Sequence, residues 1–143
     1  MLVADNLKTI LIIEDDPTIS LCTQLYLEMQ GYKAIVANNG FEALELLKKI
    51  EMPNLILLDM QMPIMNGEKF SSEFLALFDH RAPIILMAAS ANVEQQAEEI
   101  SANGWIGKPF DFDKLLEMVK KHETVSTNLK KMNEENKDGH LAK

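Results

Sequence analysis

Five short apolar runs alternate along the chain with five segments of helical periodicity, and this alternation constrains the fold more than any other feature. The runs are residues 9–13 (TILII), 33–37 (KAIVA), 55–58 (LILL), 84–88 (IILMA) and 105–107 (WIG). Strands that alternate with helices form a parallel sheet with helices on both faces. The first, third and fourth runs are almost continuously apolar, which is typical of strands buried on both faces. We therefore expect an α/β fold with these three as central strands.

Apolar residues at three- and four-residue spacing predict the helices. The first begins at Pro17 with Asp16 as its cap and stops at Gly31. The second follows residues 38–40, the third covers 68–78, the fourth about 93–101, and the fifth begins after Asp111. The side chains expected to face the sheet are Ile19, Cys22, Leu25, Tyr26 and Met29, then Phe41, Leu44, Leu47 and Ile50, and finally Phe112, Leu115, Leu116 and Val119.

Composition and charge narrow the class of protein. The chain has 143 residues, 47% hydrophobic and 25% charged, which suits one globular domain. Its net charge of −8 argues against direct nucleic-acid binding, because phosphate contacts need a basic surface. No basic leader opens the sequence, and no apolar run approaches the roughly 20 residues that cross a bilayer. We expect a soluble, cytoplasmic protein without membrane contact.

The single cysteine, Cys22, cannot form an internal disulfide. Its position beside Leu21 and Leu25 predicts that it packs as a small apolar residue. A chain with one packed thiol suits a reducing compartment.

We expect a domain over residues 8–122 and a polar C-terminal tail over 123–143. The tail contains no Gly/Pro linker and no pattern of a second domain. Val125, Leu129 and Met132 would allow the last helix to continue, but the favoured prediction is a solvated tail. The sequence leaves open whether this segment mediates dimerisation.

Acidic side chains follow two of the predicted strands. Glu14, Asp15 and Asp16 come after the first strand, and Asp59 after the third, while Lys108 follows the fifth. In an open parallel sheet, ligands bind beyond the carboxyl ends of the strands, near the point where the strand order reverses. We expect Glu14, Asp15, Asp59 and Lys108 to converge there, and Asp16 to cap the helix.

The chemistry of this cluster points to a divalent cation. Close carboxylates repel one another and resist full ionisation unless a cation holds them together. Asp15, Asp59 and a backbone carbonyl would supply oxygen ligands for Mg²⁺, with Mn²⁺ as the alternative, and the lack of His or Cys at these strand ends argues against zinc. One carboxylate is then free to attack a phosphoryl group, whose oxygens a lysine can bind. Asp59 is the candidate nucleophile.

Four motifs in this order resemble the receiver domain of two-component response regulators. They are ILIIEDDP, LILLDMQMPIMNG, PIILMAAS and WIGKPF, and the resemblance covers residues 8–122. It implies a flavodoxin-like, doubly wound sheet of five parallel strands in the order 2-1-3-4-5, with five helices. It also implies a phosphorelay protein that is not an enzyme, apart from catalysing its own phosphorylation and slow dephosphorylation.

The resemblance assigns a role to each residue of the cluster. Asp59 would be the phosphoacceptor, receiving phosphate from a phosphohistidine on a sensor histidine kinase or a histidine phosphotransfer protein. Asp15 would bind Mg²⁺ directly, Glu14 through water, and Gln61 through its backbone carbonyl. Lys108 would pair with the carboxylates and then with the phosphoryl oxygens. Output would be binding of a downstream protein at the surface formed by the fourth helix, fifth strand and fifth helix.

The same resemblance assigns roles to residues around the cluster. Pro109 would follow a cis peptide bond, an isomer almost confined to X-Pro links. The positions that surround the phosphoryl group or tune the hydrolysis of the acyl phosphate would be Gln61, Ala88, Ala89 and Ser90.

Ala88 departs from the receiver pattern. The fourth strand of receivers ordinarily ends in Thr or Ser, whose hydroxyl bonds a phosphoryl oxygen, and alanine has no such donor. Whether phosphorylation changes the surface of the protein is therefore an open question, whereas the loss of the hydroxyl does not affect the phosphorylation chemistry. Ser90 is a candidate substitute if its loop bends differently. Trp105 stands at the position of the aromatic that moves in receivers, with a fixed edge-strand aromatic as the equal alternative.

Two other functions remain as alternatives. Ala88 suits a degenerate receiver that binds partners independently of phosphorylation, although the intact acid set argues against it. A phosphatase with an aspartate nucleophile would use a strand-end Asp but commonly has a second Asp two residues later, where this chain has Gln61.

Overall fold

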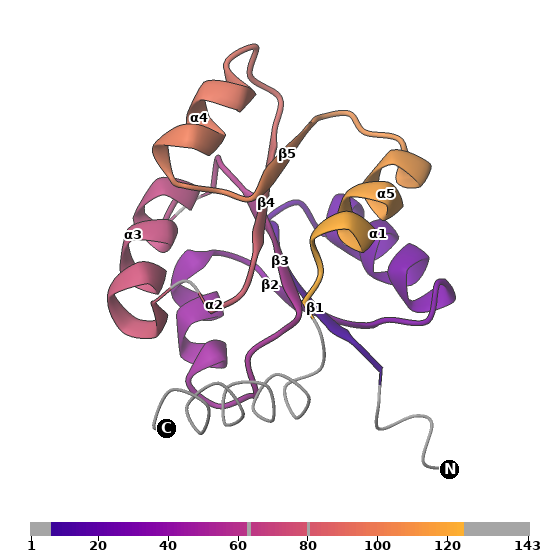
Figure 1. Ribbon diagram of the computed structural model, residues 1–143, viewed down its shortest axis with the longest axis horizontal. Helices are drawn as coiled ribbons and strands as arrows, with labels where there is room; N and C mark the ends of the chain where they lie inside the picture. The colour runs from indigo at the N-terminus through magenta and orange to yellow at the C-terminus, as the bar shows by residue number, and fades with distance from the viewer. Residues whose placement is uncertain (1–6, 63, 80, 125–143) are drawn as a thin grey trace, which may run out of the picture.

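The computed structural model describes residues 7–62, 64–79 and 81–124 (Figure 1). Five parallel strands form one sheet in the order β2-β1-β3-β4-β5, the order that the resemblance to receiver domains implies. The strands are β1 (Thr9–Ile13), β2 (Lys33–Ala37), β3 (Leu55–Asp59), β4 (Ile84–Ala88) and β5 (Gly104–Gly107). The helices are α1 (Pro17–Met29), α2 (Gly40–Leu47), α3 (Gly67–Phe78), α4 (Val93–Glu99) and α5 (Phe112–His122). The predicted fold class is therefore confirmed.

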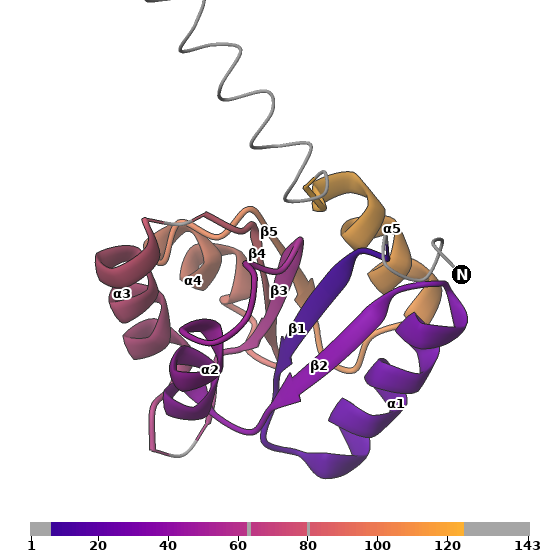
Figure 2. The ribbon, with the colours of Figure 1, turned by 90° about the horizontal axis from the view of Figure 1, so that it is seen from below.

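The helices form two layers, one on each face of the sheet. Figures 1 and 2 show α1 and α5 side by side on one face, and α2, α3 and α4 on the other. Successive side chains of a strand point to opposite faces, so β1 contributes Ile10 and Ile12 to the α1/α5 layer and Leu11 and Ile13 to the other. This double coverage explains why the central strands have no alternating polar positions.

The central strands supply most of the core. In β3 and β4 every residue is buried, and in β1 only Thr9 is partly exposed. Burying one large aliphatic side chain contributes roughly 1.5–3 kcal/mol to folding, so these runs strongly favour the central positions. The same runs end at one edge of the sheet, and that edge holds the site described below.

The predicted inward face of α1 is wrong for most of its residues. Leu25 and Met29 are 51% and 82% exposed, and Cys22 is also exposed, so its predicted packing is wrong. The buried residues are instead Ser20, Thr23 and Leu27. The inward stripe is shifted around the helix because small polar residues face the sheet. The Ser20 hydroxyl donates to the carbonyl of Pro17 at 3.2 Å, which satisfies it within the helix.

Several element ends differ from the prediction by one to three residues. β3 includes Asp59, β5 begins at Gly104, and α4 ends at Glu99. Because α2 ends at Leu47, Ile50 lies beyond the helix, where it is half-buried, and Phe41 is 55% exposed. Ala43, Leu44 and Leu47 fill the inner face of that helix. In α5, Leu115 and Val119 are buried as predicted.

Contacts with the residues that directly precede β2 and β3 continue beyond α5 to Thr124. Thr124 donates its backbone N–H to the carbonyl of Asn54 at 3.0 Å, and the Tyr32 hydroxyl donates to Glu123 at 2.7 Å. Residues 125–143, and with them the predictions for the tail, lie outside the described residues. Within the described residues, no helix has the length and apolar character needed to cross a membrane.

Candidate functional site

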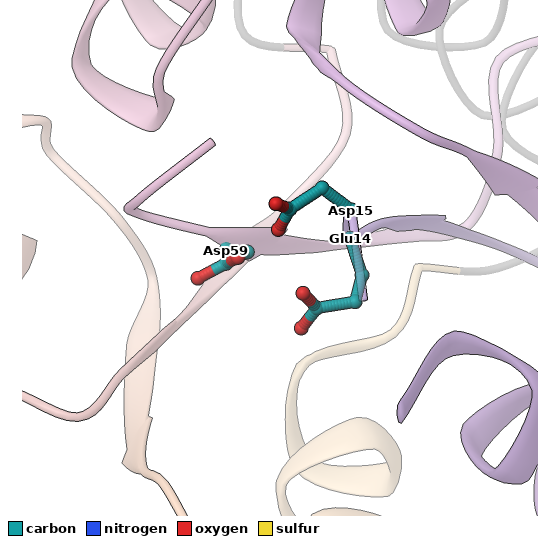
Figure 3. Close-up of side chains that lie close together, drawn as sticks. All are labelled: Glu14, Asp15 and Asp59. Atoms are coloured by element: carbon teal, nitrogen blue, oxygen red, sulfur yellow. The ribbon is translucent and has the colours of Figure 1, made fainter. Parts of the chain in front are cut away.

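The carboxylates predicted to converge lie together beyond the ends of β1 and β3. Glu14 and Asp15 directly follow β1, and Asp59 is the last residue of β3, its neighbour in the sheet. One carboxylate oxygen from each of the three lies within 4.8 Å of the others (Figure 3). Glu14 and Asp59 are buried, while Asp15 is exposed. The site therefore opens to solvent on the Asp15 side.

Lys108 reaches this cluster from the end of β5. Its Nζ lies 2.6 Å from Oε1 of Glu14 and 3.2 Å from Oδ1 of Asp59. The lysine backbone N–H donates to the carbonyl of Ala88 at 2.8 Å, which ties the start of the β5–α5 loop to the end of β4. One ammonium thus bridges two buried carboxylates that come from different strands.

Asp16 stands apart from the cluster and caps α1, as predicted. Its side chain accepts from the backbone N–H groups of Thr18 at 2.9 Å and Ile19 at 3.2 Å. Its own N–H donates to Glu14 Oε2 at 3.2 Å, which helps to hold the Glu14 carboxylate in place.

Burial and the neighbouring Glu14 carboxylate disfavour a negative charge on Asp59. Burial, followed by the hydrogen bond and the negative charge of Glu14, raises the pKa of Asp59 to about 7, and Lys108 only partly opposes the rise. For Lys108, burial opposes the positive charge, but the bond to Glu14 and the charges of Asp59 and Glu14 outweigh it and raise its pKa. One ammonium does not balance three carboxylates.

This imbalance fits a divalent cation. Three carboxylate oxygens within 4.8 Å of one another make a hard oxygen site, and the group contains no His or Cys. Mg²⁺ takes one or two carboxylates and keeps several waters, so the donors present suit it. Receiver domains bind Mg²⁺ in an acidic pocket of this kind. The individual ligand assignments to Glu14, Asp15, Asp59 and Gln61 remain predictions.

The loop after Asp59 folds back tightly onto the end of β3. Gly67 donates its N–H to the carbonyl of Met60 at 3.0 Å, and a Cβ at Gly67 would lie 2.9 Å from the carbonyl oxygen of Asp59. Only glycine fits this approach without a backbone shift. Gln61 donates its N–H to Oδ1 of Asp59 at 3.4 Å, and its side chain is exposed. The Asp59 carboxylate thus accepts a hydrogen bond from its own loop.

Ala88 ends β4 with its methyl group buried, 3% exposed, against the layer of α2, α3 and α4. It supplies no hydroxyl to the site. Ala89 and Ser90 are exposed, and Ser90 Oγ accepts from the backbone N–H of Asn92 at 3.0 Å. This bond places the serine hydroxyl in the turn before α4. The proposed tuning roles of these three residues remain predictions.

Two further predicted residues lie on the β5 side. The peptide bond between Lys108 and Pro109 is cis. Trp105 is 42% exposed and lies between two surface hollows, one bordered by Phe110 and Lys114 and the other by Glu98 and His122. Whether this indole moves remains a prediction.

Gly40 lies against the loop that follows Asp59, a contact that the sequence does not predict. Its N–H donates to the carbonyl of Met65 at 3.3 Å, and a Cβ there would lie 2.9 Å from Cγ of Met65. The Asn-Asn-Gly run predicts a helix start, which Asn39 indeed caps, but carries no signal for this long-range contact. The sequence also carries no signal for the conformation of Ile64. This residue is 83% exposed and has a φ of 67°, which is unusual for a β-branched residue.

Comparison with known sequences gives a consistent family. The family model described as "Response regulator receiver domain" matches residues 10–120. The chain is 32% identical over 123 residues to sporulation initiation phosphotransferase F of Bacillus subtilis, covering 85% of this chain and 98% of that protein. It is 36% identical over 111 residues to the regulatory protein AtoC of Escherichia coli, covering 76% of this chain and only 24% of AtoC. The similarity to AtoC thus concerns a fraction of that protein.

Solved structures agree with this. The chemotaxis protein CheY4 of Vibrio cholerae matches with a TM-score of 0.74 and 26% identity, over 81% of this chain and 98% of that one. The response regulator TrrA of Thermotoga maritima, solved in complex with Mg²⁺ and BeF, matches with a TM-score of 0.72 and 32% identity, over 80% and 98% of the two chains.

Proposed function

The chain belongs to the response regulator receiver domain family of two-component signalling, and on that premise we propose that Asp59 accepts a phosphoryl group from a phosphohistidine. The donor would be a sensor histidine kinase or a histidine phosphotransfer protein. The observation that carries the proposal is the position of Asp59, buried beside Glu14 and 3.2 Å from the Lys108 ammonium at a sheet edge that opens at Asp15. Family membership supports this class of donor, and the geometry supports Asp59 as the acceptor.

The transfer follows from the groups present. A carboxylate oxygen of Asp59 attacks the phosphorus as the P–N bond to histidine breaks, and the imidazole keeps the electron pair. The product is an acyl phosphate on Asp59. Lys108 leaves its pairing with the carboxylates and binds phosphoryl oxygens, so one cation serves both states.

The chain's own oxygens would hold Mg²⁺ at this site. Asp15 and Asp59 would bind directly, Gln61 through its backbone carbonyl and Glu14 through water. When bound, the ion neutralises charge on the carboxylates and on the transferred group. Because the pKa of Asp59 is raised to about 7 in the protein alone, its carboxylate depends on added positive charge to stay fully ionised at neutral pH.

Intact mass spectrometry tests the proposal directly. Protein incubated with Mg²⁺ and a small acyl phosphate should gain one phosphoryl group, and Asp59→Asn should not. The matched control is Asp16→Asn, a neighbouring acid that caps α1 and that asparagine replaces well, so labelling should persist. Unlabelled wild-type protein, under conditions that label an established receiver, would refute the proposal.

Ala88 favours a second candidate function, a receiver whose interactions do not depend on phosphorylation. Its buried methyl offers no hydrogen bond to a phosphoryl oxygen. In this case downstream proteins would bind the surface of α4, β5 and α5 equally well before and after labelling. Pull-down with labelled wild-type protein and with Asp59→Asn protein distinguishes the two candidate functions. Equal capture of downstream proteins by both favours the phosphorylation-independent receiver.

A further inference from the structure

Three aromatic rings connect α1 to the loop that carries Lys108. Tyr26 of α1 stacks on Phe112, the first residue of α5, with ring centroids 4.8 Å apart and planes 20° apart. Phe112 meets Phe110 edge-on, with centroids 5.8 Å apart and planes at 81°. Both separations and both orientations lie within the range in which aromatic pairs attract. Figure 1 shows α1 and α5 side by side on the same face of the sheet.

The loop between β5 and α5 is short and is held at both of its ends. At its start, the Lys108 N–H donates to the carbonyl of Ala88 at 2.8 Å. At its end, Asp111 caps α5 by accepting from the N–H of Asp113 at 2.8 Å. Phe110 lies between these anchors, only two residues after Lys108, and packs against the core layer of α1 and α5. The position of Phe110 therefore constrains the backbone from which the lysine side chain extends.

The lysine side chain is largely buried, 16% exposed, and extends from this backbone to two carboxylates. Its Nζ contacts Glu14 at 2.6 Å and Asp59 at 3.2 Å, so both contacts depend on where the β5–α5 loop sits relative to β1 and β3. The rings lie on the α1/α5 face, whereas the carboxylates extend from the strand ends. Lys108 is the residue of this loop that reaches Glu14 and Asp59.

We propose that Tyr26, Phe112 and Phe110 form an aromatic brace that positions Lys108 at the acceptor site, a role that rests on the proposed function of Asp59. The three are positioning residues, because they are inferred to act through Lys108. Through the brace, the position of the Lys108 side chain depends on the packing of α1 as well as on β5.

Removing the brace has two consequences of opposite sign. A looser Lys108 meets the phosphoryl group less often in the productive position, so phosphorylation slows. The same lysine competes with Mg²⁺ for Glu14 and Asp59, so loosening it leaves the carboxylates freer to bind the ion. General destabilisation would instead weaken phosphorylation and Mg²⁺ binding together, and this difference in sign separates positioning from packing.

The experiment compares Tyr26→Ala and Phe112→Ala with the matched control Leu116→Ala, which removes apolar volume from the same helix layer and keeps all three rings. Phosphorylation by a small acyl phosphate is followed by intact mass, and Mg²⁺ affinity by calorimetry. We expect both brace variants to label about tenfold more slowly, with Leu116→Ala within about twofold of wild type. We also expect the brace variants to bind Mg²⁺ roughly two- to fivefold more tightly. Tyr26→Phe keeps the ring and should restore both properties.

Each outcome decides the proposal. Labelling of the brace variants at the wild-type rate, or equal slowing in Leu116→Ala, overturns it. If Tyr26→Ala or Phe112→Ala does not fold, as judged by thermal denaturation, Tyr26→Leu and Phe112→Leu keep the apolar volume and take their place. If wild-type protein is not labelled at all, the proposed function fails, and the Mg²⁺ titration alone judges the brace: tighter binding supports it, and unchanged or weaker binding overturns it.

Discussion

Metal-free protein should lose stability as the pH rises from about 4 to about 7, because Asp59 ionises at lower pH in the unfolded chain than in the fold. The pKa of Asp59 is raised from an ordinary 3.8 to about 7 by burial and by Glu14. Between these values the folded state binds more protons than the unfolded state, so the free energy of unfolding falls with pH. Below the window both states are protonated, and above it both are ionised, so the slope disappears on either side.

The expected loss is about 2 kcal/mol. A shift of about three pKa units corresponds to roughly 4 kcal/mol at 1.36 kcal/mol per unit. We reduce this by about half, because the site opens to solvent at Asp15 and solvent screens the charges.

Urea denaturation in the presence of a chelator, at several pH values between 4 and 8, measures this loss. The comparison is with Asp59→Asn, which cannot ionise and should be more stable than wild type at pH 8 by a similar amount. Taking the difference between the two proteins cancels the other titrating groups to first order. Parallel pH profiles, or an Asp59→Asn variant that is less stable at every pH, would show that the buried carboxylate carries no such cost.

Three further predictions concern the same edge of the sheet. Saturating Mg²⁺, at about 100 times its dissociation constant, should raise the free energy of unfolding by about 2.7 kcal/mol, and Asp15→Asn should lose most of this gain in a calorimetric melt. Gly67→Ala should cost about 1–3 kcal/mol in urea denaturation, because its Cβ would lie 2.9 Å from the carbonyl oxygen of Asp59, whereas Gly107→Ala, with its nearest atom 4.0 Å away, should cost less. A comparable loss in both would contradict the steric reasoning. Ala88→Ser should increase the change in Trp105 fluorescence that a beryllofluoride mimic produces, and an unchanged response would argue against a hydroxyl-driven movement.

The strand pattern was predictable because burial on both faces leaves a simple signal. β1, β3 and β4 are almost continuously apolar, which is typical of short strands buried on both faces of a sheet. The helix faces were less predictable. In α1 the sheet-facing positions include Ser20 and Thr23, while Leu25 and Met29 face solvent, so hydrophobicity alone misidentified the buried stripe.

The candidate site was predictable in its residues but not in its contacts. Glu14, Asp15, Asp59 and Lys108 stand at strand ends, and parallel topology brings strand ends together. No local pattern indicates that Gly40 meets the loop after Asp59, since that contact depends on how α2 and α3 pack.

The sequence by itself determined the sheet, the edge at which the acids gather, and the family. Each of these depends on the alternation of apolar runs with helical segments or on the residue types at the strand ends. Only the tertiary structure decided that Lys108 bridges Glu14 and Asp59, that burial raises the pKa of Asp59 to about 7, and that rings from α1 and α5 lie beside the lysine's loop. The physical reason is distance. Coulombic attraction, desolvation and ring stacking act over a few ångströms between residues far apart in the chain, and only folding sets those separations.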